Sequence, residues 1–293
     1  MIGTSVGIGL AFVAMLCWGF GDFMIQRSSR KMGDWETLFV ITAFGSVVLL
    51  PFAFKDIVGL FSYQSAAAIL VFCGLLYLVG ALLDFESLKI GKITIVEPIW
   101  SFEIVVSAVL AFFIIGERLD AIQIGLIALL IIGLFLVSMR DYHFVKLHRL
   151  LLERGTLMAF AAALIMGVVN FLIAIGSRAT DPIIVNFTIN TIVAVSCGLY
   201  LWRHNKLKRL VADVKESPKT IIPMVISDNA AYVAFAFSLS LAPVGVAVAL
   251  SESYIIVAVI LGFIVGKERV LNHQKLGLAV AVFAAVILAA VTS

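Results

Sequence analysis

Charged residues are scarce in this sequence: Asp, Glu, Lys and Arg make up 13% of its 293 residues. Soluble domains usually carry about 25%. Apolar residues reach 62%, and the mean hydropathy is +1.14. One water-soluble core cannot hide so many apolar side chains, so the composition predicts an integral membrane protein. The small net charge of +3 argues against a nucleic-acid partner.

Several chemical motifs are also missing. The three cysteines, Cys17, Cys73 and Cys197, are odd in number and form no CxxC pair, which disfavours a disulfide framework or a zinc site. No GxxxxGK[ST] loop is present to cradle ATP, and no HExxH is present for zinc hydrolysis. The sequence therefore predicts neither a pump driven by ATP nor an enzyme, and it calls for no cofactor and no metal.

Long apolar runs dominate what remains. About 20 apolar residues are needed to cross a bilayer as a helix. The sequence predicts ten such spans, at residues 5–25, 36–54, 66–85, 93–115, 121–139, 155–177, 183–202, 219–241, 244–266 and 274–292. The predicted fold class is an all-α polytopic protein, placed in the cell (inner or plasma) membrane.

The two halves of the chain resemble each other. Gly116-Glu117-Arg118-Leu119 follows the fourth span, and Gly266-Lys267-Glu268-Arg269 follows the ninth. Gln123 and Gln274, six residues after the two glutamates, keep the same separation of 151 residues. We therefore predict two five-helix repeats, at 1–139 and 155–293, joined by a cytoplasmic linker at 140–154. An odd number of spans inverts the second repeat, which is typical of secondary transporters whose binding site lies between the halves.

Basic residues are distributed unevenly between the two sides of the membrane. Only Lys55, Arg118 and Arg178, of 21 Lys and Arg residues, fall outside the loops that follow the odd-numbered spans. Short basic loops stay in the cytoplasm. The sequence therefore predicts that loops 140–154 and 203–219 are cytoplasmic and that both termini lie outside.

These motifs resemble the drug/metabolite transporter superfamily, in particular its EamA-type members with two repeats. The likeness covers essentially the whole chain and is carried by short motifs: Cys17-Trp18-Gly19, Ser87-Leu88, Pro98, Gly116-Glu117-Arg118-Leu119 with Gln123, and Lys267-Glu268-Arg269 with Gln274 and Gly277. The resemblance implies a secondary transporter with ten helices and a central cavity. The second half departs from the first in having Ala249 where the first has Pro98, and many members keep both termini in the cytoplasm.

Acidic residues inside the spans are the strongest candidates for function, because a charge within the bilayer is costly and is usually retained for a purpose. Three fall near the middle of their spans: Glu103, Asp228 and Glu252. Three others fall toward the predicted cytoplasmic end: Asp22, Asp84 and Glu97. No Lys or Arg lies deep in any span. Carboxyl groups in such surroundings can bind and release a proton, or hold a cation.

Aromatic and amide side chains accompany these carboxyl groups. Trp18, Trp100 and Tyr232 lie three or four residues from an acidic residue and so share its helix face, and Tyr254 follows Glu252 closely. Such aromatics suit organic cations or sugar rings, although ordinary packing also places them there. Asn170 is a deep amide that can bind substrate or bond a neighbouring helix.

The sequence thus predicts a proton-coupled secondary transporter that moves a small neutral, zwitterionic or cationic metabolite by alternating access. Its expected partners are the solute, protons and the lipid bilayer, and the chain leaves monomer and homodimer open. Sodium coupling, exchange and uniport stay open as alternatives to proton coupling. Two other functions remain on the same fold: a flippase for lipid-linked sugars and a membrane scaffold that transports nothing.

Overall fold

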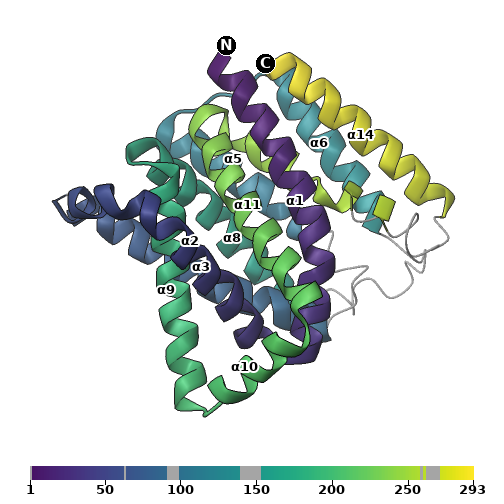
Figure 1. Cartoon of the computed structure of the whole chain (residues 1–293). Helices are drawn as coiled ribbons and strands as arrows, with labels where there is room; N and C mark the ends of the chain where they lie inside the picture. Colours follow the sequence, from purple (N-terminus) through teal and green to yellow (C-terminus); the bar gives the residue numbers. More distant parts are fainter. Residues whose placement is uncertain (1, 63, 91–98, 139–152, 258–259, 262–270) are drawn as a thin grey trace.

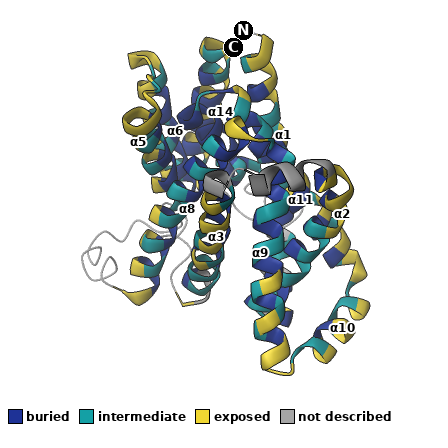
Figure 2. Cartoon of the chain, turned by 90° about the vertical axis from the view of Figure 1, so that its left-hand side faces the viewer, coloured by how far each residue is buried: buried dark blue, intermediate teal, exposed yellow. Residues whose placement is uncertain are grey.

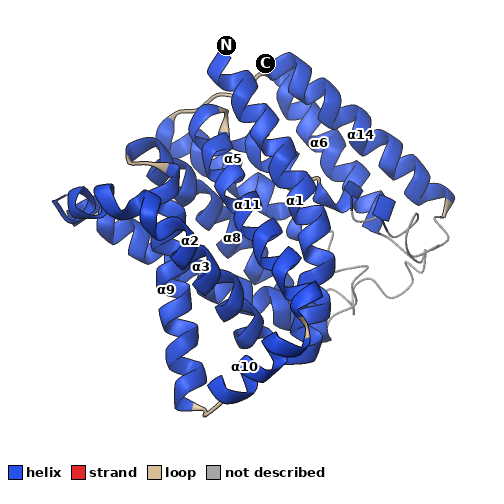
Figure 3. Cartoon of the chain, viewed as in Figure 1, coloured by secondary structure: helices blue, strands red, loops and turns tan. Residues whose placement is uncertain are grey.

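A computed structural model describes residues 2–62, 64–90, 99–138, 153–257, 260–261 and 271–293. Figure 3 shows that this part of the chain is built from helices and loops. The helices are α1 (Ile2–Met32), α2 (Asp34–Ser62), α3 (Gln64–Ile90), α5 (Phe102–Ile115), α6 (Ala121–Ser138), α8 (Arg154–Ala179), α9 (Pro182–Arg203), α10 (Leu207–Glu216), α11 (Pro218–Leu241), α12 (Val244–Ser251) and α14 (Asn272–Thr292).

Eight of these helices are long and apolar enough to cross a membrane. Two shorter apolar helices, Phe102–Ile115 and Val244–Val257, accompany them. Helices suit a bilayer because every backbone polar group is bonded within its own segment. Large apolar side chains such as Phe113 and Val47 remain exposed on the outer faces of the bundle (Figure 2), where lipid would cover them. The predicted all-α polytopic fold is confirmed.

Each major helix contact joins one half of the chain to the other. Helix α1 packs on α11, and α8 packs on α3. In the same way α5 packs on α8, and α12 packs on α1. The remaining pairs, α2 with α9 and α6 with α14, join corresponding helices of the two halves. The bundle therefore has the pseudo-twofold arrangement that an inverted repeat requires.

Two glycines show this symmetry in atomic detail. A Cβ atom at Gly19 of α1 would lie 2.5 Å from the Cβ of Val257. A Cβ atom at Gly167 of α8 would likewise lie 2.5 Å from the Cβ of Val106. The repeat relates Gly19 to Gly167 and Val106 to Val257. Each half therefore uses a glycine to bring corresponding helices into close contact.

Two glutamines clamp α6 against α14. The Gln123 amide donates a hydrogen bond to the Thr292 hydroxyl at 3.0 Å, at the last turn of α14. The Gln274 amide donates to the Val137 carbonyl at 2.9 Å, near the end of α6. The two helices run antiparallel, so each glutamine at a helix start reaches the end of its partner.

Two spans are interrupted where the sequence predicts continuous helices. Helix α12 ends at Ser251, a turn follows at Glu252 and Ser253, and helical structure resumes at Tyr254. In the first half, Ser101 forms a turn immediately before α5 begins. Ser101 and Glu252 are 151 residues apart, so the interruption is itself part of the repeat. Interrupted helices supply ion and substrate sites in many transporters.

The basic segment predicted as a linker at 203–219 contains a helix, α10, between the ends of α9 and α11. Figure 1 places this helix at the end of the bundle opposite both termini. The basic segment 203–219 and the termini therefore lie at opposite ends of the bundle. The linker predicted at 140–154 lies largely outside the described residues.

Candidate functional site

Two buried carboxyl groups, Glu103 and Asp228, and the half-buried Glu252 lie on helices that pack between the halves. Glu103 lies in the first turn of α5, directly after the interruption at Ser101, and is 7% exposed. Glu252 occupies the C-cap of α12, at the matching interruption. Asp228 lies in the middle of α11 and is 6% exposed. These are the three residues that the sequence places deepest in the membrane.

Glu103 lies at the centre of a small hydrogen-bonded group. The Asn170 side chain on α8 donates from Nδ2 to Oε2 of Glu103 at 3.2 Å. The Glu252 side chain is also hydrogen-bonded to the Glu103 carboxyl. An ionised carboxylate can only accept hydrogen bonds, so a bond between two carboxyl groups requires a proton on one of them. This geometry suits a single proton held between the two residues.

Asp228 is associated with a tyrosine instead. Tyr232 follows it by one helical turn, and its phenol lies near enough to both Asp228 and Glu252 for direct electrostatic interaction. The Tyr232 hydroxyl is also hydrogen-bonded to Tyr77 of α3. Tyr232 therefore interacts with both Asp228 and one member of the glutamate pair.

Aromatic rings pack around these groups. Trp18 of α1 meets Tyr232 edge-on with ring centroids 5.0 Å apart, and meets Phe235 at 5.1 Å. Tyr254 lies 6.5 Å from Trp18, and Tyr77 lies 5.5 Å from Tyr232. Trp18, Tyr232 and Tyr254, predicted from the sequence, thus meet at one place. An edge-to-face cluster of this kind holds its rings in fixed orientations.

Of the four other predicted residues, the structure describes the side chains of two. Glu97 and the side chain of Asp22 lie outside the described residues. Asp84 is half-buried near the end of α3, seven residues beyond Tyr77. Trp100 is half-buried, and its indole N–H has no hydrogen-bond partner in the described part of the chain.

Sequence reasoning missed two members of the cluster. Tyr77 and Phe235 were not predicted, because only aromatics close in sequence to a carboxylate were considered. Ser251 and Ser253 flank Glu252, and each donates its hydroxyl hydrogen to a backbone carbonyl four residues earlier, at 2.8 Å.

The deep amides of Asn190 and Asn229 bond to each other and to a helix backbone. Asn190 Nδ2 donates to Oδ1 of Asn229 at 3.4 Å, and Asn229 Nδ2 donates to the Ile41 carbonyl at 3.1 Å. These bonds join α9, α11 and α2. Of the two roles open to such amides, this geometry supports helix bonding.

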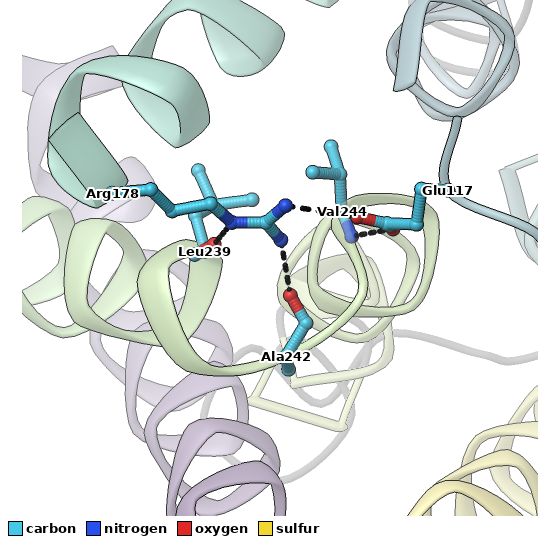
Figure 4. A network of polar contacts seen from close by, with 5 residues as sticks. All are labelled: Glu117, Arg178, Leu239, Ala242 and Val244. Carbon is cyan, nitrogen blue, oxygen red and sulfur yellow. Dashed lines mark hydrogen bonds and ion pairs between the residues drawn. The ribbon is translucent and has the colours of Figure 1, made fainter. Parts of the chain in front are cut away.

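A second polar network closes the bundle at the end that carries the termini (Figure 4). Arg178, at the end of α8, forms an ion pair with Glu117 at 3.0 Å. Its guanidinium also donates to the Leu239 carbonyl at 2.9 Å and to the Ala242 carbonyl at 2.8 Å. Glu117 accepts a further hydrogen bond from the Val244 backbone N–H, at the start of α12. The network joins the loop after α5 to three helices of the second half.

The described residues contain no group of three or more His, Cys, Asp or Glu side chains placed to hold a metal ion. In the same part of the chain, neither Glu103 nor Asp228 forms a salt bridge with Lys or Arg; the salt bridges involve Glu36, Glu117, Asp213 and Glu216. The site is therefore acidic, aromatic and free of strong positive charge around these two carboxyl groups.

Together the fold and the site define the class of the molecule: a polytopic membrane protein of two inverted halves around a buried acidic interior. The chain belongs to the EamA-like transporter family, whose sequence profile matches residues 5–139 and again residues 153–290. The predicted place in the drug/metabolite transporter superfamily is confirmed, and the protein is a transporter, not an enzyme.

Two relatives add to this. An "uncharacterized transporter" of Archaeoglobus fulgidus is 28% identical over 112 residues, which are 38% of this chain and 40% of that protein. The chain therefore aligns with less than half of that relative's length. A crystal structure of another protein superimposes with a TM-score of 0.75 over 98% of this chain and 97% of its own, at 13% identity. At that identity the likeness concerns the fold alone.

Proposed function

We propose that this protein is a proton-coupled secondary transporter that moves a small neutral, zwitterionic or cationic metabolite by alternating access. The observation that carries the proposal is the pairing of Glu103 with Glu252 across the two halves, with Tyr232 interacting with both Glu252 and Asp228. A site at the interface of inverted repeats is exposed to each side in turn as the halves rock. Groups placed there can exchange ligands with both compartments.

Protons fit the chemistry of this site. The hydrogen bond between Glu103 and Glu252 needs a proton, and opening the interface to water would separate the two groups and favour its release. The Asn170 amide keeps the Glu103 carboxyl in place through this change. The pair therefore offers one exchangeable proton per cycle.

The substrate's charge follows from the same residues. Carriers of phosphorylated metabolites need Lys or Arg to bind the phosphate, whereas here the interior offers carboxyl groups, amides and aromatic rings. Asp228 beside Tyr232 and Trp18 suits the amino group of an amine or a zwitterion.

A thermal-shift screen across amino acids, amines, sugars and phosphorylated metabolites tests this prediction. A bound solute at a hundredfold excess over its Kd should add about 2.7 kcal/mol of stability. We expect ligands among the first three classes, and we expect Asp228→Asn to weaken any ligand that carries an amine. Tight binding of a sugar phosphate or nucleotide-sugar would contradict the assignment.

Orientation is a separate prediction. We expect loop 203–219 and α10 to face the cytoplasm, because basic segments are retained there. A cysteine at the exposed position Lys215 should resist a membrane-impermeant thiol reagent on intact cells, and one at exposed Arg118 should react. The native thiols Cys73 and Cys197 are buried and give little background. Labelling of Lys215→Cys without labelling of Arg118→Cys would reverse the orientation.

A further inference from the structure

Helix α10 lies at a boundary of the membrane. It joins the end of α9 to the start of α11, and both of those helices are long and apolar enough to span a bilayer. Figure 1 shows it running across that end of the bundle between the two. A short helix in this place meets the headgroup layer of the adjacent leaflet.

One face of α10 is fixed against the protein. Leu207, Leu210 and Val214 share this face, and Leu210 is 4% exposed. They pack into a cluster that includes Leu201 of α9 and Met224 of α11. The helix is therefore held in one rotation about its axis, which fixes the side chains that remain outside.

A line of three residues is left exposed along α10. Lys208, Val211 and Lys215 are separated by three and four residues, so they follow one another along one side of the helix. All three are exposed, and Val211 is 54% exposed although it is apolar. A valine between two lysines is an unusual combination for a surface that faces only water.

The acidic residues of α10 do not neutralise this line. Asp213 pairs with Arg209 at 3.8 Å, and Glu216 pairs with Lys31 at 3.7 Å. Both acids of the helix are thus engaged by other basic residues. The two lysines of the line have no ion pair within the described part of the chain.

We propose that Lys208, Val211 and Lys215 form a binding surface for the headgroups of anionic phospholipids in the adjacent leaflet. The lysines would meet lipid phosphates, and Val211 would enter the boundary between headgroups and acyl chains. Trp202, in the last turn of α9, is 67% exposed and marks the same boundary, where exposed tryptophans concentrate. This surface is remote from the carboxyl groups between the halves and does not depend on which solute is carried.

Native mass spectrometry of the full-length protein tests the proposal, with phosphatidylglycerol and phosphatidylcholine as the probe lipids. We expect retention of phosphatidylglycerol well above that of phosphatidylcholine. The double variant K208Q/K215Q should bind phosphatidylglycerol about tenfold more weakly, since each lysine near an anionic surface contributes to attraction. Gel filtration and circular dichroism should show that the variant remains folded.

The matched control is R203Q/K275Q, which removes the same charge from exposed positions at the same end but leaves both the line and the Arg209–Asp213 pair intact. It should change phosphatidylglycerol retention less than twofold. Equal weakening in both double variants would overturn the proposal in favour of a diffuse basic field. Equal retention of the two lipids by the unmodified protein would overturn it as well.

Discussion

Replacing Glu103 or Glu252 with glutamine is expected to abolish solute accumulation driven by a pH gradient. Glutamine has nearly the size of glutamate and keeps the capacity for hydrogen bonding, but its amide cannot release a proton. With one proton per solute, a gradient of one pH unit supports about tenfold accumulation, since each unit is worth about 1.4 kcal/mol. We expect this factor to fall to one in each variant, measured in proteoliposomes with a solute identified by the thermal-shift screen.

Exchange of solute between the two sides should survive in the same variants, because it requires no net proton movement. Glu153→Gln, at an exposed position before α8, is the control and should accumulate solute normally. If Glu103→Gln, Glu252→Gln and Asp228→Asn all keep pH-driven accumulation, the proposed coupling group is wrong. Asp22, Asp84 and Glu97 then become the next candidates.

The repeat could be predicted from the sequence because inverted symmetry leaves a direct trace in it. Gln123 and Gln274 keep a constant separation, and the structure shows why: each bonds the far end of the helix that the other begins. Gly19 and Gly167 match each other in the two halves because each allows an equivalent close contact between helices. Residues that make an equivalent contact in each half can therefore be recognised from the sequence alone.

The interruptions at Ser101 and Glu252 could not be predicted in this way. Pro98 lies three residues before Ser101, but its counterpart before Glu252 is Ala249, so the sequence carries no helix-breaking signal shared by both halves. Hydropathy windows record composition without backbone geometry. Tyr77 was missed for a related reason. Its contact with Tyr232 joins α3 to α11, and nothing in the spacing of residues along either helix indicates which helices meet.

Helix α10 could have been recognised. Leu207, Leu210 and Val214 have helical spacing, but the high density of basic residues between Arg203 and Lys219 favoured a loop. Amphipathic helices at a membrane surface have low net hydrophobicity, so a search for long apolar runs passes over them.

The contacts of Glu117, a residue of the repeated motif, indicate a structural role. It bonds the N-terminus of α12 through Val244 and pairs with Arg178. Glu268, its counterpart in the second half, lies outside the described residues. The network around Glu117 and Arg178 therefore fixes the end of the bundle that carries the termini, and its loss should be measurable as lost stability.

Arg178→Gln is expected to lower the free energy of unfolding by about 1 to 2 kcal/mol, because its ion pair with Glu117 is partly exposed and such a pair contributes less than a buried one. The change leaves Glu117 unpaired and removes two hydrogen bonds to the carbonyls of Leu239 and Ala242. The stability of Arg178→Lys should fall between that of the wild type and that of Arg178→Gln. An ammonium group lacks the planar fork with which the guanidinium bonds all three partners. Glu117→Gln should cost less than Arg178→Gln, because its amide oxygen can still accept from Val244.

Thermal unfolding in detergent, followed with a thiol-reactive dye, measures these differences through Cys73 and Cys197, which are fully buried in the folded protein. Arg118→Gln is the matched control: it removes a neighbouring exposed arginine and should change stability by no more than about 0.5 kcal/mol. The order of stability should be wild type and Arg118→Gln, then Glu117→Gln, then Arg178→Gln. If Arg178→Gln unfolds at the same temperature as Arg118→Gln, the network does not hold the two halves together at this end. Its bonds would then be too weak, or too exposed to water, to stabilise the bundle.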